Sequence, residues 1–353
     1  MRKREGRMDK RNTVVSDDSL QTAKAWMTKY PVVDALGSGA PTEKFINDII
    51  TGGINVVSWT IANSYRDSTR DVFHSMLTRK WLIQSMPNKC ALARSTADIE
   101  RALSEGKVAI IYNFQGAEFM QDFFHWLEVF WDLGLRILQP FYNRENRMGY
   151  GCQEPNDMGL KHFGIEIVRY CNELGILLDC SHAGERTTLD MMEISEKPCV
   201  FSHSNPKALR DNPRNISDTQ IKNCAAKGGV IGCPIYSDFV ADTTGGYQPT
   251  VDDWVKHVDY VANLVGIDHV GIGSDIATSP GFGLAWHNTF RRQFRETCGG
   301  MTFETHEIKG FNHSHANFPL LITALVQRGY KEQDMAKIMG GNWLRVYKAA
   351  WGA

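Results

Sequence analysis

The sequence predicts an α/β protein, a single (β/α)8 TIM barrel with long loops over its C-terminal face. Two observations favour this fold. Eight short apolar runs are bounded by glycine, proline or polar residues, which is typical of strands buried on both faces, and helix-like segments alternate with them. The alternative, a doubly wound sheet, is less favoured because DALGSGAP, which includes the end of the first run, lacks the GxGxxG spacing of a phosphate loop.

The predicted strands follow one another along most of the chain. They occupy residues 31–36 (PVVDAL), 54–61 (INVVSWTI), 108–114 (VAIIYNF), 135–142 (LRILQPFY), 176–182 (ILLDCSH), 198–203 (PCVFSH), 229–235 (GVIGCPI) and 269–275 (HVGIGSD).

Helices are predicted between these strands from end signals and from apolar residues on one face. The segment 41–52 begins with Pro-Thr and ends with Gly, and 96–106 begins at Thr96 as N-cap and ends at Gly106. The segments 163–175 and 250–266 each place apolar residues at helical spacing. We predict that residues 1–29 form a tail and a lead-in helix, and that 30–353 form the barrel.

Composition excludes several function classes. The 353 residues carry 39 basic and 40 acidic side chains, a net charge of −1, which gives no electrostatic footprint for nucleic acid or an anionic membrane. No apolar run of about 18 residues predicts a membrane helix, and the basic N-terminus has no apolar stretch of a secretory signal. The expected partner is a small-molecule substrate, and a homo-oligomer stays open.

The eight cysteines are scattered and form no CxxC pair. In a chain of this length, that spacing indicates reduced, mostly buried thiols rather than a disulfide framework or a cysteine zinc site. The expected location is therefore cytoplasmic.

In a barrel of this kind, functional groups lie at the C-terminal ends of the strands. The polar residues at those ends are Asp34, Gln115, Tyr142 with Asn143, His182, His203 and Asp275. Two histidines that end neighbouring strands, with a carboxylate at the end of the last, predict a metal or acid–base site. Imidazole and carboxylate ligands suit zinc, manganese or iron, and three protein ligands (His182, His203 and Asp275) leave positions for water and substrate.

Two loops add further candidates. Arg214 lies in the loop after the sixth predicted strand and is suited to grip a substrate carboxylate, although a solvated or cap-pairing arginine is the alternative. The segment 142–160 is a long loop without periodicity, which favours a functional loop. We favour a structural role for its thiol, Cys152, over a role as nucleophile.

Several phrases resemble one known family. They are FGIEIVRYCNELGILLDCSHAG, KPCVFSHSNPKAL, NPRNISDTQI, DHVGIGSD and GGNWLRVYKAAWG. Their order and spacing resemble the membrane (renal-type) dipeptidase family of the amidohydrolase superfamily, over roughly residues 30–352. The resemblance implies a (β/α)8 barrel with a two-zinc site that hydrolyses dipeptides. It implies that His182 and His203 are metal ligands, that Arg214 binds the substrate carboxylate and that Asp275 is the general acid or base.

The chain departs from the family pattern at the other ligands. Leu36 and Ser38 stand where the family has a His-x-Asp pair, and Gln115 stands where a glutamate bridges the metals. Tyr142 replaces a substrate-contacting histidine, and Ala277 replaces a second aspartate. We therefore expect a divergent branch with one divalent metal per chain, zinc first with manganese or iron as alternatives.

The most favoured function is a dipeptidase-type metallohydrolase acting on an amide or peptide-like small molecule that bears a carboxylate. Asp275 and Tyr142 are the catalytic candidates, and Arg214, Asn143 and Gln115 the substrate-binding candidates. If Asp275 is a metal ligand, then Tyr142, Glu154 or Asp157 would transfer protons. The alternatives are a metalloenzyme of other chemistry (lyase, isomerase or non-haem iron type) and a non-catalytic binding protein.

The segment 281–318 reads as an insertion over one face of the barrel. His313 and His315, at i and i+2, and His287 are candidates for a replacement ligand or a substrate contact, although loop histidines in capping roles are the more ordinary interpretation. An aromatic cluster in the same segment, Trp286, Phe290 and Phe294, is more typical of packing than of a binding cage.

Overall fold

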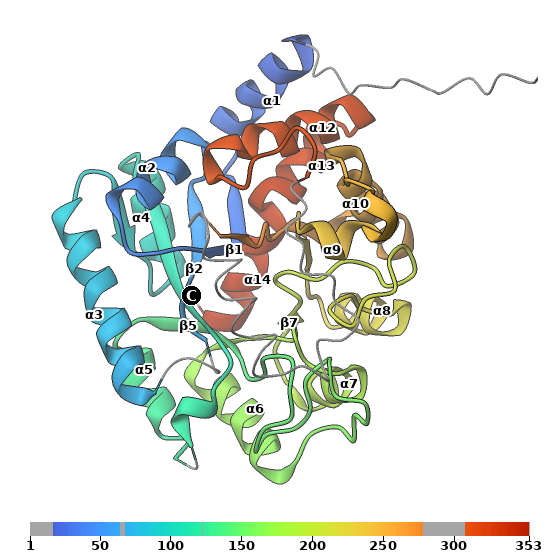
Figure 1. Ribbon diagram of the computed structural model, residues 1–353. Coiled ribbons are helices and arrows are strands. Elements are labelled where there is room, and N and C mark those ends of the chain that lie inside the picture. The colour runs from blue at the N-terminus through green and yellow to red at the C-terminus, as the bar shows by residue number, and fades with distance from the viewer. Residues whose placement is uncertain (1–16, 64–67, 122, 278–307, 353) are drawn as a thin grey trace, which may run out of the picture.

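The computed structural model describes residues 17–63, 68–121, 123–277 and 308–352, and it confirms the predicted α/β barrel. Helices surround a curled parallel sheet, and the chain runs round it in sequence order (Figure 1). The strands are β1 (Val33–Ser38), β2 (Val56–Asn63), β3 (Cys90–Leu92), β4 (Val108–Gln115), β5 (Leu135–Gln139), β6 (Leu177–Asp179), β7 (Cys199–Val200), β8 (Ile231–Cys233), β9 (Val270–Ile272) and β10 (Ile276–Ala277).

The helices fall into one outer ring and a few short connecting turns. The α-helices are α1 (Asp17–Lys29), α2 (Glu43–Thr51), α3 (Thr69–Ser85), α4 (Thr96–Ser104), α5 (Trp126–Asp132), α6 (His162–Leu174), α7 (Glu185–Ile194), α8 (Asp218–Ala226), α9 (Ser237–Val240), α10 (Val251–Val265), α12 (Phe318–Arg328), α13 (Glu332–Ala336) and α14 (Asn342–Trp351). The turns are η1 (Glu118–Met120), η2 (Thr244–Gly246), η3 (Ile267–His269), η4 (His315–Asn317) and η5 (Lys337–Gly341), of which η5 is a π-helical turn.

All neighbouring strands pair in parallel. The main sheet has the order β10-β1-β2-β4-β5-β6-β7, and β8 pairs with β9. A parallel bridge between Phe201 and Ile231 joins β7 to β8, and β10 returns the chain to β1. The C-terminal ends of the strands therefore meet at one mouth, where the site lies.

Every predicted strand is present, with shifted ends. The strand predicted at 135–142 ends at Gln139, before Pro140, because proline cannot donate to a sheet. Two short strands were not predicted. β3 pairs with the first residues of β4 (108–110), and β5 pairs with the later residues of β4 (112–115). β10 directly follows Asp275.

Alternate residues of the strands enter two different cores. In β4, Ala109 and Ile111 belong to an inner cluster, whereas Ile110, Tyr112 and Phe114 pack with the surrounding helices. The inner cluster also contains Trp343, Val346, Tyr347 and Ala350 of α14, together with residues from the beginnings of the strands. The last helix therefore closes the N-terminal end of the barrel and leaves the mouth open to ligands.

The predicted helix ends are largely confirmed. Thr42 caps α2 by accepting from the N–H of Phe45, and Gly175 ends α6 with a φ of 72°. The prediction for α4 was wrong by one residue: Ser95, not Thr96, is the N-cap, because the Ser95 hydroxyl accepts from the N–H of Asp98.

The predictions about the cysteines, the 281–318 segment and membrane helices can be compared only with the described residues. Cysteines 90, 171, 180, 199, 224 and 233 are free and buried, and Cys152 is free and half-buried. His287, the aromatic cluster of residues 286–294 and Cys298 lie outside the described residues. Over the described ranges, no helix has both the length and the apolar character needed to cross a membrane.

Candidate active site

The mouth of the barrel brings His182 and His203 together, as their positions after the neighbouring strands β6 and β7 predict. Their Nε2 atoms are 2.9 Å apart and their ring centroids 4.9 Å apart. Both side chains are buried, and burial lowers the pKa of each well below 6.5, with the Arg214 guanidinium acting in the same direction. Both imidazoles are therefore neutral at neutral pH, which is the form that binds a metal.

Each imidazole is also held from its other side. His182 Nδ1 lies 2.6 Å from Asn143 Oδ1, and His203 Nδ1 lies 2.7 Å from Ser202 Oγ. The Tyr142 ring stacks on His182, with centroids 4.2 Å apart and planes inclined by 21°. Asn143, predicted to bind substrate, thus has its amide oxygen committed to His182.

The backbone at the site adopts an unusual conformation. Four non-glycine residues in the described part of the chain have a positive φ, and three of them belong to the site: Asn143 (64°), His182 (66°) and Asp275 (56°). The left-handed region is sparsely populated by such residues and persists where surrounding contacts impose it.

A loop segment imposes this conformation near His182. The N–H of Cys152 donates to the carbonyl of His182 (2.8 Å), and the N–H of Gly184 donates to the carbonyl of Tyr150 (2.9 Å). A Cβ at Gly151 would lie 2.1 Å from the backbone of Asn143 and Arg144, so only glycine permits this approach. The predicted functional loop 142–160 is in this way docked on the end of β6.

The environment of Cys152 does not activate its thiol. Its Sγ lies 3.3 Å from Asn143 Oδ1. Burial raises the pKa of the Cys152 thiol to about 11, although Arg214 opposes the shift. The thiol is therefore protonated at neutral pH, which favours the structural role over that of a nucleophile.

Arg214 is fully buried, although it lies in a loop. It is 2% exposed, its Nη2 donates to the carbonyl of His203 (3.1 Å), and its guanidinium lies 5.2 Å from the centre of the Phe239 ring. Within the described residues its Nε has no hydrogen-bond partner, and no acidic side chain lies within 4.0 Å of the guanidinium. A buried cation without an anion is the feature expected of a carboxylate-binding residue.

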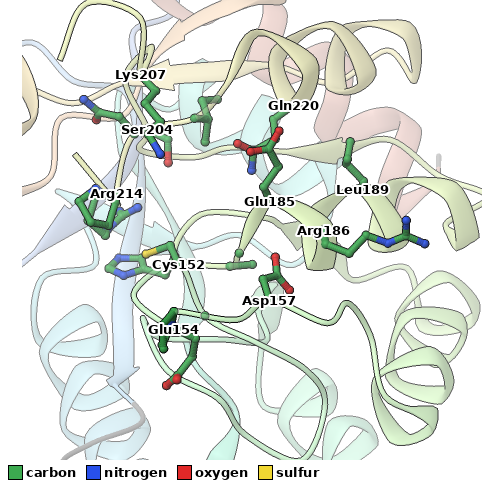
Figure 2. Close-up of a pocket in the computed structure, with 18 of the residues that line it drawn as sticks. Cys152, Glu154, Asp157, Glu185, Arg186, Leu189, Ser204, Lys207, Arg214 and Gln220 are labelled. Atoms are coloured by element: carbon green, nitrogen blue, oxygen red, sulfur yellow. The ribbon is translucent and has the colours of Figure 1, made fainter. Parts of the chain in front are cut away.

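Arg214 borders a cavity of about 520 Å³ that also touches His182, Cys152 and Ser204. Figure 2 shows Arg214, Ser204 and Lys207 on one side of this cavity, with Glu185, Arg186 and Leu189 across from them. Ser204 is buried, and its hydroxyl has no hydrogen-bond partner among the described residues. The cavity can therefore admit a ligand to both the imidazole pair and the arginine.

Asp275 is not drawn into the imidazole pair. No three His, Cys, Asp or Glu side chains form a metal-binding group in the parts of the chain that the structure describes, so only two of the three predicted ligands converge. Burial raises the pKa of Asp275 to about 7, opposed by Arg214 and assisted by Asp34. Its N–H donates to the carbonyl of Leu36 (3.0 Å), which holds it on the β1 side of the mouth.

The side chains at the positions of the absent family ligands are themselves uncharged. Leu36 is buried, and Gln115 Nε2 donates to Thr60 Oγ1 (2.8 Å). Beside them Asn113 Nδ2 donates to Ser58 Oγ (2.8 Å). Asn113 Oδ1 has no hydrogen-bond partner among the described residues, and the buried carboxylate of Asp34 lies beside Leu36 and accepts from its N–H (3.2 Å).

Other predicted candidates have structural partners. Asp157 accepts from the Thr187 hydroxyl (2.7 Å) and backbone N–H (3.1 Å), near the beginning of α7, and Glu154 accepts from the N–H of Glu145 (2.9 Å). His315 is fully buried, with Nε2 3.4 Å from Asp34 Oδ2, and the half-buried His313 ring packs near Phe311. Neither histidine belongs to a group of metal ligands within the ranges described.

Sequence analysis missed Tyr236 and Ser204. Tyr236 follows β8, and burial raises the pKa of its hydroxyl well above 10, with Asp238, Asp275 and Tyr142 acting in the same direction. It directly follows the predicted strand 229–235, so the rule applied to the other strand ends would have found it. Ser204 gave no such signal, because serines after strands are common.

The imidazole pair fits one metal ion. Two ligands with bonds of about 2.0–2.1 Å to the same ion can be no more than about 4 Å apart, and these Nε2 atoms are within that limit. Their Nδ1 atoms are engaged by protein groups, as is usual for metal-ligating histidines. Leu36 and Gln115 themselves supply no anionic ligand for a second ion.

Known proteins resemble this chain over most of its length. The model of the family described as "Membrane dipeptidase (Peptidase family M19)" matches residues 13–291 and 299–351. The "Uncharacterized protein in pqqA 5'region" of Klebsiella pneumoniae is 30% identical over 281 residues, which cover 77% of this chain and 93% of that protein.

Solved structures agree with the fold. The crystal structure of an amidohydrolase from Pseudomonas aeruginosa is 32% identical, with a TM-score of 0.85 over 94% of this chain and 99% of that one. A metallo peptidase from Rhodobacter sphaeroides, liganded with a phosphinate mimic of the dipeptide L-Ala-D-Ala, is 20% identical, with a TM-score of 0.74 over 91% and 99% of the two chains. The chain belongs to the membrane dipeptidase family, peptidase family M19, and is a dipeptidase-type hydrolase of the amidohydrolase superfamily.

Proposed function

We propose that this protein hydrolyses an amide or peptide-like small molecule that bears a free carboxylate, and that it uses one divalent metal held by His182 and His203. The observation that carries the proposal is the pair of neutral imidazoles, 2.9 Å apart, beside a buried arginine without an acidic partner among the described residues. The zinc, manganese or iron ion would lower the pKa of a bound water to about 7 and polarise the scissile carbonyl.

The protein groups around the pair supply the remaining chemistry. Arg214 binds the substrate carboxylate through charge-assisted hydrogen bonds and so places the amide near the imidazoles. Asp275, whose pKa burial raises to about 7, accepts or donates a proton near neutral pH. Tyr142 covers one face of His182 and keeps the ring in place.

The substrate class follows from the same geometry. A cavity of about 520 Å³ that borders both His182 and Arg214 suits a molecule of dipeptide size. The dipeptide mimic bound to the Rhodobacter sphaeroides metallo peptidase belongs to this class. We expect turnover of ordinary dipeptides below about 1 s⁻¹, because clamping of the carbonyl and the nucleophile by two metals is lost.

The test combines elemental analysis with hydrolysis assays on full-length protein reconstituted with zinc, manganese or iron. The substrates are L-Ala-D-Ala, L-Ala-L-Ala and their C-terminal amides. We expect one metal per chain, slow hydrolysis of the free acids only, and loss of the metal in His203→Gln. His269→Gln is the matched control, because His269 donates to the carbonyl of Gly229 outside this pair, and it should keep the metal.

Three results would contradict the proposal. Two metals per chain would show that other groups complete the second site. Absence of metal after reconstitution would favour a binding protein. One metal without hydrolysis of any amide would favour a metalloenzyme of other chemistry.

A further inference from the structure

Two strand pairs of this barrel are joined by the same arrangement of an aspartate and a serine. Between β6 and β7, Asp179 Oδ1 accepts from the N–H groups of Ser202 (2.9 Å) and Ser181 (3.0 Å), and the Ser202 hydroxyl lies 2.5 Å from Asp179 Oδ2. Between β9 and β1, Asp34 Oδ1 accepts from the N–H groups of Ser274 (2.8 Å) and Leu36 (3.2 Å), and the Ser274 hydroxyl lies 2.6 Å from Oδ2. We call these the Asp179 clamp and the Asp34 clamp.

The two clamps differ in the second partner of the serine oxygen. Ser274 Oγ lies 3.2 Å from the backbone N–H of Ile276, which can only donate. Ser274 Oγ therefore accepts from Ile276, and its single hydrogen goes to Asp34 Oδ2 at 2.6 Å rather than to the more distant carbonyl of Leu36 at 3.4 Å. Ser202 Oγ has the imidazole of His203 in that place, with Nδ1 at 2.7 Å.

We propose that Asp179 and Ser202 are positioning residues that fix the tautomer of His203. The Asp179 carboxylate takes the hydrogen of the Ser202 hydroxyl, so Ser202 Oγ must accept from His203 Nδ1–H. The lone pair of His203 Nε2 is then directed at His182. Burial raises the pKa of Asp179, and three donors that point at its carboxylate, two of them backbone N–H groups, oppose this shift and stabilise the ionised form.

The partner imidazole is arranged in the same way. Asn143 Oδ1 accepts at His182 Nδ1, so His182 also presents the lone pair of its Nε2. Two lone pairs 2.9 Å apart repel each other unless a cation lies between them. The Asp179 clamp therefore keeps the two imidazoles from forming a hydrogen bond with each other and prepares them to bind a metal. The metal-binding role rests on the proposed function, whereas the tautomer of His203 does not.

Asp179→Asn tests the mechanism because it is isosteric. Two backbone N–H groups still require an oxygen at the Oδ1 position, so the amide nitrogen takes the place of Oδ2 and donates to Ser202 Oγ. The Ser202 hydrogen then turns to His203 Nδ1, and the His203 proton moves to Nε2. In the catalytic triad of serine proteases, the same Asp→Asn substitution leaves the histidine in the wrong tautomer.

The first measurement is ¹⁵N NMR of the metal-free, histidine-labelled protein, with His203→Gln used to assign the signals. We expect the Nδ1–H tautomer of His203 in the wild type and the Nε2–H tautomer in Asp179→Asn. The second measurement is zinc affinity by competition with a chelator. We expect a loss of about 10–100-fold in Asp179→Asn, the usual effect of removing a group that orients a ligand.

Asp34→Asn is the matched control, because it makes the same change in a clamp without an imidazole on its serine. It should leave the His203 tautomer and the zinc affinity unchanged. If Asp179→Asn does not fold, Ser202→Ala compared with Ser274→Ala makes the same contrast, and Ser202→Thr, which keeps the hydroxyl, should restore the zinc affinity.

The proposal is overturned by an Nε2–H tautomer of His203 in the wild type, or by equal losses of zinc affinity in the Asp179 and Asp34 variants. A wild type that binds no zinc would contradict the proposed function instead. In that case the NMR result still decides the positioning role, so the two failures are distinguishable.

Discussion

The burial of Arg214 changes how this residue must be tested. A loop arginine suggests a side chain that can be replaced without effect on the fold, but Arg214 is 2% exposed and donates to the carbonyl of His203. Substitution will therefore cost some stability as well as ligand binding. A comparison between two ligands, instead of between two proteins alone, separates these effects.

Arg214→Lys should weaken binding of a carboxylate-bearing ligand by about 1.5–3 kcal/mol, the scale of charge-assisted hydrogen bonds, because lysine cannot form two parallel bonds to a carboxylate. The measurement is calorimetric titration with a phosphinate mimic of L-Ala-D-Ala. The control is the C-terminal amide of the same mimic, whose affinity should change much less. Equal losses for both ligands would show that Arg214 supports the site without contacting the carboxylate.

The turn η1 lies in the connection between β4 and α5 and contains a partly buried glutamate, Glu118. Glu118 in η1 accepts from the N–H of Ala117 (3.1 Å), while its Oε1 is shielded from solvent and has no hydrogen-bond partner in the described residues. Burial raises the pKa of Glu118 to about 7, with Asn146 of the docked loop opposing the shift. This pKa makes the stability of the connection dependent on pH.

The native state holds the Glu118 proton to a higher pH than the unfolded chain, whose glutamate pKa is about 4.3. Between that pH and about 7 the native state binds more protons, so the free energy of unfolding should fall as pH rises, by at most about 4 kcal/mol from this group. Glu118→Gln should remove this part of the decline. The measurement is urea unfolding between pH 5 and 8.

Glu166→Gln is the control for this prediction, because Glu166 is exposed on α6 and its ion pair with Arg169 is on the surface. It should leave the pH dependence of the free energy of unfolding unchanged. If the free energy of unfolding falls with rising pH by the same amount in Glu118→Gln as in the wild type, Glu118 does not titrate between pH 5 and 8.

At the scale of the whole molecule, α14 closes the barrel. Tyr347 lies in the inner cluster, its ring stacks on Trp351 with centroids 4.7 Å apart, and its hydroxyl has no hydrogen-bond partner among the described residues. The ring therefore stabilises the closed end, whereas the buried hydroxyl does not contribute a protein hydrogen bond.

Tyr347→Ala should cost about 3–5 kcal/mol, the loss expected when a large buried aromatic side chain is removed. Tyr347→Phe keeps the ring and should be neutral or stabilising by up to about 1 kcal/mol, because it removes an unsatisfied polar group. Chemical denaturation of both variants measures these differences. A substantial loss of stability in Tyr347→Phe would instead reveal a hydrogen bond made by the hydroxyl.

Much of the barrel could be predicted because its signals are local. A strand buried on both faces reads as a short apolar run, and a helix between strands carries its own end residues. Two short strands were missed, β3 with three residues and β10 with two; length alone does not explain this, because β6 to β9 are equally short and were predicted.

The candidate site was predictable only in its composition. The rule that strand ends carry functional groups placed His182 and His203 at one mouth, and their Nε2 atoms do converge. The same rule could not show that Asp275 stays apart from them. Its N–H is bonded to Leu36, far along the chain, and its carboxyl is affected by Arg214 and Asp34.

The sequence alone determined the order of strands and helices, the polar residues at the strand ends and the loss of the family's other ligands. The tertiary structure decided the left-handed backbone at Asn143, His182 and Asp275, the burial of Arg214 and the two Asp–Ser clamps. The physical reason is the range of the contacts. A hydrophobic pattern is written within a few residues, whereas the Asp34 clamp joins residues 240 positions apart and depends on the closed sheet that brings them together.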